Sequence, residues 1–294
     1  MTPSTAGKSV RTIWFGMRCA FTRAALEGAI AAGDAVTPVA AVLPRGPKPA
    51  SAGWPEPPLD RWLRERGIEI VEVGRLTEVD LAAIERLVRE REIPLGAGAC
   101  FPWKVPAQLR SAIRCGVLNI HPSLLPALRG PEPVFHAYRL GLEATGVTVH
   151  LMDDGWDSGP IVAQTRVAIP DDGRADAFEA ELARRGGEML AGIAHQWCAG
   201  TLDARPQDDA RASWAPVPGP TERHMLRTLT VAQARRFLSA CPPLTATDAD
   251  TGVTVAVAGV AARGEVAVRV RCRDGDLWVH RIGTNGVANG TGGV

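Results

Sequence analysis

Hydrophobic and polar positions along the first two thirds of the chain predict strands and helices in alternation. Short runs rich in β-branched residues, such as 10–15 and 36–43, are followed by segments with apolar residues at helical spacing, such as 77–92. Further runs of the strand type are 68–73, 93–100, 116–120, 147–152 and 161–169. This alternation predicts an α/β fold with a mostly parallel, Rossmann-like sheet that carries helices on both faces.

The longest predicted helix covers residues 174–197 and has Gly186 and Gly187 in its middle. Glycine lowers helix propensity, so we expect either a kink or close packing against a neighbouring helix at this point. The segment that follows is rich in Asp, Pro and Gly, which is typical of a linker.

The last third of the chain predicts a second, smaller domain. A helical segment at 231–238 is followed by alternating strands at 253–257, 266–270 and 277–280. We therefore expect a large domain, a linker, a small β-rich domain and a flexible Gly-rich tail, at residues 1–198, 199–220, 221–282 and 283–294.

Composition and charge change this picture little. Hydrophobic residues make up 46% of the chain, enough for a sizeable core, and 33 basic residues balance 32 acidic ones. A net charge of +1 gives no global field that would attract nucleic acid. Because no signal peptide and no run of about eighteen apolar residues is evident, we expect a cytoplasmic protein without a membrane partner.

The cysteines and the isolated histidines suggest no metal site. The cysteines lie singly, without a Cys-x-x-Cys pair or a Cys/His cluster at zinc spacing, at positions Cys19, Cys100, Cys115, Cys198, Cys241 and Cys272. We expect reduced thiols without a catalytic role. His136 and His150 have no companion at metal-ligand spacing, and structural roles are favoured for both.

Polar residues with catalytic potential follow two of the predicted strands. Asn119 and His121 stand at the end of strand 116–120, and Asp157 follows strand 147–152. By itself, Asn-Ile-His-Pro could be a structural turn after a strand. The carboxyl ends of strands in an α/β sheet usually carry the active site, so the sequence predicts that the three side chains meet at one edge.

Residues 116–164 resemble the formyltransferases that use 10-formyltetrahydrofolate. The resemblance rests on Asn-Ile-His followed by Pro-Ser-Leu-Leu-Pro, on Arg129-Gly130, and on an Asp directly before Ser-Gly downstream. Within the family the likeness is greatest to the branch that formylates methionyl-tRNA, and it extends over about residues 10–216. It implies the formyltransferase fold and 10-formyltetrahydrofolate as formyl donor.

The resemblance assigns the catalytic roles to Asn119, His121 and Asp157. When an amine attacks a formamide carbon, a tetrahedral oxyanion forms and needs hydrogen-bond donors. We expect the Asn119 amide and a protonated His121 to supply them. Asp157 would raise the pKa of His121 and relay the proton lost by the amine.

The same resemblance places the folate between the loops 100–105 and 153–157. The residues expected to bind it are Phe101, Trp103, Val105, Leu118, Asp153, Asp154, Gly155 and Trp156. Those expected to bind the acceptor are Arg18, Ser123, Arg129 and Gly130. The aromatic residues are equally typical of plain packing. No Gly-x-Ser-x-Gly motif surrounds Ser123, so a serine nucleophile is not indicated.

Several acceptors are compatible with this core. The amino group of methionyl-tRNA is the first interpretation, although the loop 43–54 after the second strand has only two positive charges, Arg45 and Lys48. A small-molecule amine such as an amino sugar, an amino acid or a hydroxyornithine-type amine is the main alternative. Two others are a formyltetrahydrofolate deformylase and a folate-binding module without catalysis. The sequence leaves the oligomeric state open.

Overall fold

The computed structural model describes residues 9–46, 59–262 and 267–282. Most of the loop 43–54, the start of the predicted strand 266–270 and the predicted tail 283–294 lie outside the described residues. The chain forms two compact units, the first made of residues 1–133, 145–168 and 176–215, the second of 134–144, 169–175 and 216–294. The domain boundaries drawn from the sequence stay predictions.

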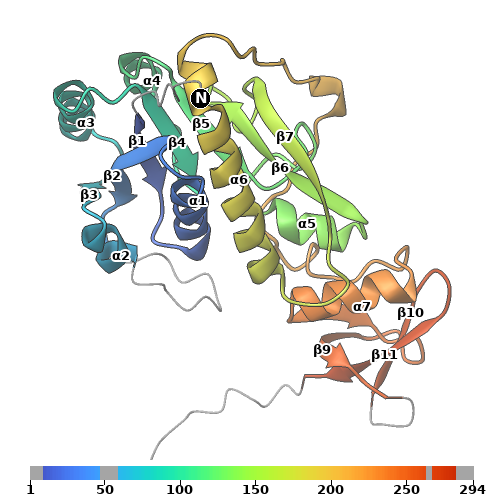
Figure 1. Ribbon diagram of the computed structural model, residues 1–294. Coiled ribbons are helices and arrows are strands. Elements are labelled where there is room, and N and C mark those ends of the chain that lie inside the picture. The colour runs from blue at the N-terminus through green and yellow to red at the C-terminus, as the bar shows by residue number, and fades with distance from the viewer. Residues whose placement is uncertain (1–8, 47–58, 263–266, 283–294) are drawn as a thin grey trace, which may run out of the picture. The chain divides into compact units, whose positions relative to one another are not determined.

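The first unit is built on a seven-stranded sheet with the order β3-β2-β1-β4-β5-β6-β7 (Figure 1). Its strands are β1 (Val10–Gly16), β2 (Val36–Pro44), β3 (Glu69–Val73), β4 (Leu95–Ala99), β5 (Val117–His121), β6 (Ala144–Leu151) and β7 (Ile161–Ala168). Strands β1 to β5 pair with one another in parallel, and β6 is antiparallel to β5. The predicted α/β fold with a mostly parallel sheet is confirmed.

One face of this sheet is covered by α3 (Glu78–Glu90) and α4 (Ala107–Ala112). Their apolar residues, among them Ile84 and Leu109, pack against Phe15 of β1 and its neighbours. A capping box fixes the start of α3: Asp80 N–H donates to the Thr77 hydroxyl, and the Asp80 carboxylate accepts from Thr77 N–H. Helix α4 is absent from the sequence-based prediction because six residues are too few to show a helical period.

On the other face, α1 (Ala20–Ala31) and α6 (Ala175–Cys198) touch through their glycines. A Cβ on Gly187 would lie 1.9 Å from the Ala25 carbonyl oxygen, and one on Gly186 would lie 2.3 Å from Ile120 in β5. The two glycines therefore let α6 approach both α1 and the strand that ends in His121. The sequence predicts either a kink or close packing at Gly186 and Gly187, and the structure shows close packing. A further short helix is α2 (Leu59–Glu65).

The second unit contains a four-stranded antiparallel sheet with the order β10-β11-β9-β8. Its elements are α7 (Val231–Ala240), β8 (Leu244–Thr247), β9 (Thr254–Val260), β10 (Val268–Arg271) and β11 (Asp276–Arg281), with most of α5 (Pro133–Arg139). The buried Arg236 joins its three segments by ion pairs to Glu143 at 3.2 Å and Asp171 at 3.3 Å. The predicted smaller β-rich part is confirmed, with β8 as an additional strand.

None of the helices in the described residues has an apolar stretch long enough to cross a membrane.

Gly187→Ala should destabilise the protein, because the added methyl group would collide with the Ala25 carbonyl oxygen. Overpacking of this kind costs about 1–3 kcal/mol. The matched control is Gly192→Ala in the same helix, where a Cβ meets nothing within 4 Å. Helix propensity should make that variant about 0.5–1 kcal/mol more stable. Urea unfolding of both variants measures the difference, and equal shifts in the two would contradict close packing at Gly187.

Candidate active site

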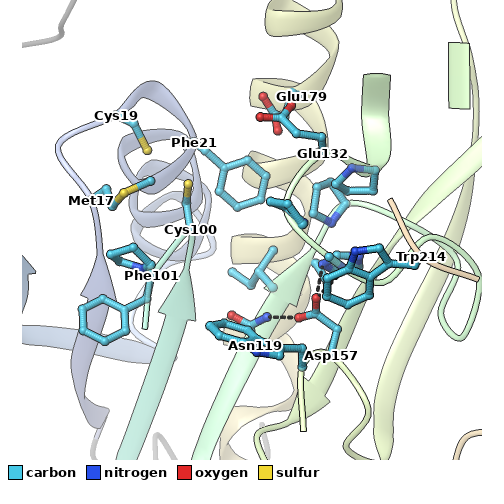
Figure 2. A pocket seen from close by; sticks show the side chains of 18 residues that line it. Met17, Cys19, Phe21, Cys100, Phe101, Asn119, Glu132, Asp157, Glu179 and Trp214 are labelled. Carbon is cyan, nitrogen blue, oxygen red and sulfur yellow. Dashed lines mark hydrogen bonds and ion pairs between the residues drawn. The ribbon is translucent and has the colours of Figure 1, made fainter. Parts of the chain in front are cut away.

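A cavity of about 580 Å³ opens at the carboxyl ends of β1, β4 and β5 (Figure 2). The predicted site residues that line it are Phe101, Asn119, His121, Gly130, Trp156 and Asp157. Strand β5 supplies Asn119 and His121, and the loop between β6 and β7 supplies Asp157. The structure thus brings together the three residues that the sequence analysis singled out.

Asp157 is held by hydrogen bonds from two separate segments. Gly130 N–H donates to Oδ2 at 2.9 Å, and the Asn119 amide nitrogen donates to Oδ1 at 3.4 Å. Figure 2 draws the contact between Asn119 and Asp157 as a dashed line. The side chain is only 14% exposed. Burial alone would raise the pKa of Asp157, but the His121 and His150 rings and the Gly130 N–H outweigh it and hold the pKa well below the usual range. The carboxylate is therefore ionised.

His121 is fixed in one tautomer by its backbone partner. Its Nε2 lies 2.8 Å from the Leu128 carbonyl oxygen, which can only accept, so Nε2 carries the proton. The other ring nitrogen, Nδ1, lies 3.6 Å from Asp157 Oδ2. In the neutral ring, Nδ1 is therefore the atom with a free lone pair.

The pKa of His121 corrects an expectation from the sequence. Asp157 was expected to raise it and to keep the ring protonated. Burial is the largest effect and lowers the pKa below 6.5, although Asp157 and the Leu128 carbonyl act in the opposite direction. His121 is thus neutral at pH 7. The sequence could indicate that a carboxylate is near, but the loss of water around the ring follows only from the surrounding fold.

His150 belongs to the same cluster. It pairs with Asn119 in the antiparallel register of β5 and β6, and its Nε2 lies 3.1 Å from the Asn119 amide nitrogen. The same Nε2 lies 3.6 Å from Asp157 Oδ1. The sequence predicts a structural role for His150, because it has no companion at metal-ligand spacing. Its position opposite Asn119 depends on strand pairing, which the local sequence does not show. The contacts show a ring that supports both Asn119 and Asp157.

Gln207 holds the Asp157 loop from outside. Its Nε2 donates to the carbonyl oxygens of Asp157 at 2.8 Å and Gly159 at 2.7 Å. Asp157 needs such support because its backbone has φ 53°, a left-handed conformation that is uncommon for residues other than glycine. Sequence reasoning gave Gln207 no role, since it lies 50 positions away from Asp157.

Arg129 acts through Gln207. Its Nη2 donates to Gln207 Oε1 at 2.8 Å and to Asp209 at 2.7 Å. Arg129 does not line the cavity, and its contact with an acceptor stays a prediction. Its neighbour Gly130 does line the cavity, and its N–H is already bound to Asp157.

The other residues predicted to bind the acceptor also lie outside the lining of the cavity. Arg18 pairs with Asp60 at 2.9 Å and with Glu72. Ser123 is fully buried and donates its hydroxyl to the Ala127 carbonyl at 2.6 Å. Both side chains thus stabilise the local fold.

The two loops expected to hold the folate lie beside the cavity. Phe101 lines it and makes edge contacts with both Phe15 and Trp103, with ring centroids 5.5 Å apart in each pair. Trp156 also lines it, and the Lys104 ammonium lies 5.5 Å from the centre of its ring.

The remaining predicted folate residues are not part of the lining. Val105 and Leu118 are buried, and Trp103 packs against the core. Within the acidic loop, Asp153 accepts from Gly155 N–H at 3.0 Å, and Asp154 forms an ion pair with Arg110. These contacts shape the loop, whereas folate binding by these residues stays a prediction.

Comparison with known proteins agrees with the geometry. Residues 79–192 match the formyl transferase family. A methionyl-tRNA formyltransferase from Herpetosiphon aurantiacus is 36% identical over 158 residues, 54% of this chain and 51% of that enzyme. The match therefore spans about half the length of that relative.

Two solved structures share the fold. Glycinamide ribonucleotide transformylase 1 from Symbiobacterium toebii has a TM-score of 0.54 at 21% identity, over 71% of this chain and 99% of that one. HypX from Aquifex aeolicus, in complex with tetrahydrofolic acid, has a TM-score of 0.54 at 15% identity, over 93% of this chain and 44% of that one.

Residues 79–192 are thus similar to the formyl transferase family. Parts of the sequence are 34–37% identical to methionyl-tRNA formyltransferases.

Asp157→Asn should lower the pKa of His121 further, because the carboxylate is the main influence that raises it. The pH titration of the His121 ring signals in the NMR spectrum measures this shift. Asp172→Asn, which changes an exposed aspartate, should leave the titration unchanged. A pKa that rises in Asp157→Asn would contradict the assigned balance between burial and charge.

Proposed function

We propose that the protein transfers the formyl group of 10-formyltetrahydrofolate to a primary amine. The observation that carries this proposal is a neutral His121 whose free Nδ1 lies 3.6 Å from an ionised Asp157 at the wall of the cavity. A neutral imidazole beside a carboxylate can accept a proton and have the new charge stabilised. During formyl transfer the attacking amine loses a proton, which such a group can accept.

The donor would enter beside the loops 100–105 and 153–157. The aromatic rings of Phe101 and Trp156 in the cavity lining offer apolar surface for a pterin ring. The match of residues 79–192 to the formyl transferase family supports this choice of donor, as does the shared fold of a protein whose structure was solved in complex with tetrahydrofolic acid.

His121 would carry the proton between the two nitrogens. As the amine attacks the formyl carbon, Nδ1 accepts the proton that the amine loses, and Asp157 stabilises the imidazolium. When the carbon–nitrogen bond to the folate breaks, the same Nδ1 returns the proton to the departing nitrogen. Nε2 keeps its proton throughout because the Leu128 carbonyl holds it.

Asn119 would stabilise the oxyanion that forms between these two steps. Its amide nitrogen now contacts His150 at 3.1 Å and Asp157 at 3.4 Å. The longer contact is the weaker one, so this N–H can turn toward a charged oxygen in the cavity at small cost. The contact with His150 keeps the amide in place while it does so.

His121→Ala should lower kcat with 10-formyltetrahydrofolate about 10²–10⁴-fold, the usual contribution of a general base. The matched control, His195→Ala, changes an exposed histidine on α6 and should keep the wild-type rate. Stopped-flow or steady-state assays of tetrahydrofolate release measure both. Near-normal turnover in His121→Ala would refute the mechanism, provided that circular dichroism shows a native fold.

We propose the amino group of methionyl-tRNA as the acceptor, because curated relatives that are 34–37% identical to parts of this chain carry that name. A small amine is the second candidate, and the charge of the cavity favours it. Of the described residues that line the cavity, none is lysine or arginine, whereas Glu132 and Glu179 are acidic (Figure 2). Such a lining attracts an ammonium group and repels phosphate.

Purified protein supplied with 10-formyltetrahydrofolate should formylate methionyl-tRNA and leave amino sugars and free amino acids unchanged. Mass spectrometry of each acceptor after incubation identifies the product. Formylation of a small amine with unreacted methionyl-tRNA would overturn the choice of acceptor. Release of formate without any acceptor would indicate a deformylase, and folate binding without turnover would indicate a binding module.

A further inference from the structure

Two cysteines that stand 83 positions apart in the sequence interact through their side chains within the first unit. Cys115 follows α4 and precedes β5, and Cys198 is the last residue of α6. The two thiols share a hydrogen bond. Both side chains are partly exposed, and both cysteines are free.

The backbone around the two cysteines is fixed by a crossed pair of hydrogen bonds. The Trp197 indole N–H donates to the Cys115 carbonyl at 2.8 Å, and the Arg114 guanidinium donates to the Cys198 carbonyl at 3.2 Å. Trp197, which precedes Cys198, is thus bound to Cys115, and Arg114, which precedes Cys115, is bound to Cys198. The contact between the thiols is therefore part of a built junction between the end of α6 and the start of β5.

The two thiols differ in acidity. The hydrogen bond from Cys198 lowers the pKa of Cys115 to about 7, with Arg114 adding to this effect against the opposing effect of burial. The same hydrogen bond and burial raise the pKa of Cys198. Cys198 also ends a helix, where the carbonyl groups disfavour negative charge. Cys115 is therefore the nucleophile, and Cys198 stays protonated beside it.

We propose that Cys115 and Cys198 form a peroxide-sensitive dithiol that closes reversibly to a disulfide. A reactive, accessible thiol next to a second cysteine that can resolve it is the usual arrangement of such sites. This inference does not depend on the formyl transfer proposed above.

The reaction consumes one hydrogen peroxide. The Cys115 thiolate attacks a peroxide oxygen and breaks the O–O bond, which gives a sulfenic acid and a hydroxide ion, and this hydroxide takes a proton from the solvent to become the first water. The Cys198 sulfur then attacks the Cys115 sulfur, and the departing hydroxide takes the Cys198 proton as the second water. Two electrons pass from the two thiols to the peroxide. A small thiol such as dithiothreitol reverses the change.

The junction lies at the amino end of β5, whereas Asn119 and His121 lie toward its carboxyl end. A disulfide there would close a loop from Cys115 to Cys198 and restrict the unfolded chain. We expect the oxidised protein to melt several degrees higher than the reduced one, at about the same catalytic rate.

The test treats the full-length protein with a small excess of hydrogen peroxide at pH 7, alkylates the remaining thiols and maps the peptides by mass spectrometry. The expected product links Cys115 to Cys198 and returns to two alkylated cysteines after dithiothreitol. The control within the same sample is Cys100, which is the exposed cysteine. Oxidation of Cys100 while Cys115 and Cys198 are both alkylated would overturn the proposal.

The variant Cys198→Ala separates the reaction of Cys115 with peroxide from the formation of the disulfide by Cys198. In Cys198→Ala, the Cys115 sulfenic acid should persist and be trapped by dimedone, and the pH of half-maximal alkylation of Cys115 should rise from about 7 toward 9. Cys241→Ala should behave as the wild type in both measurements. An unchanged alkylation profile in Cys198→Ala would contradict the interaction between the two thiols. If this variant does not fold, the peptide map of the wild-type protein still tests the proposal.

Discussion

The hydrogen bond from Gly130 N–H to the Asp157 carboxylate, 2.9 Å long, is the contact on which the site depends. It joins the loop after β5 to the loop between β6 and β7, and it helps to keep a buried carboxylate ionised. Asp157 occupies a left-handed backbone conformation that such contacts must maintain. Gln207 completes the support from a third segment. The geometry of His121 and Asn119 follows from where this carboxylate is held.

Burial and charge act on His121 in opposite directions, and burial prevails. The result is a ring that is neutral at pH 7 and lies beside a group ready to stabilise its charged form. A histidine that was already protonated could not accept a proton from an amine. Burial keeps the ring neutral and therefore able to act as the proposed base. A closer ion pair with Asp157 would instead favour the protonated ring.

Helix α6 contacts residues at both ends of strand β5. Its central glycines let it pack against α1 and Ile120, one residue from His121, and its last residue lies against Cys115 before the strand begins. The helix thereby positions the strand that carries two of the proposed catalytic residues. Because one fold can host several acceptors, the acceptor has to be argued from the cavity and not from this framework.

The sequence by itself determined the strand and helix alternation and the position of Asn119, His121 and Asp157 near strand ends, because these features depend on local spacing. Their catalytic roles stay predictions. Only the tertiary structure decided that His150 faces Asn119, that Arg129 supports Gln207 and that Cys115 meets Cys198. It also showed that burial outweighs the effect by which Asp157 raises the pKa of His121. Contacts between distant segments and the exclusion of water arise only when the chain is folded, so no local sequence pattern predicts them.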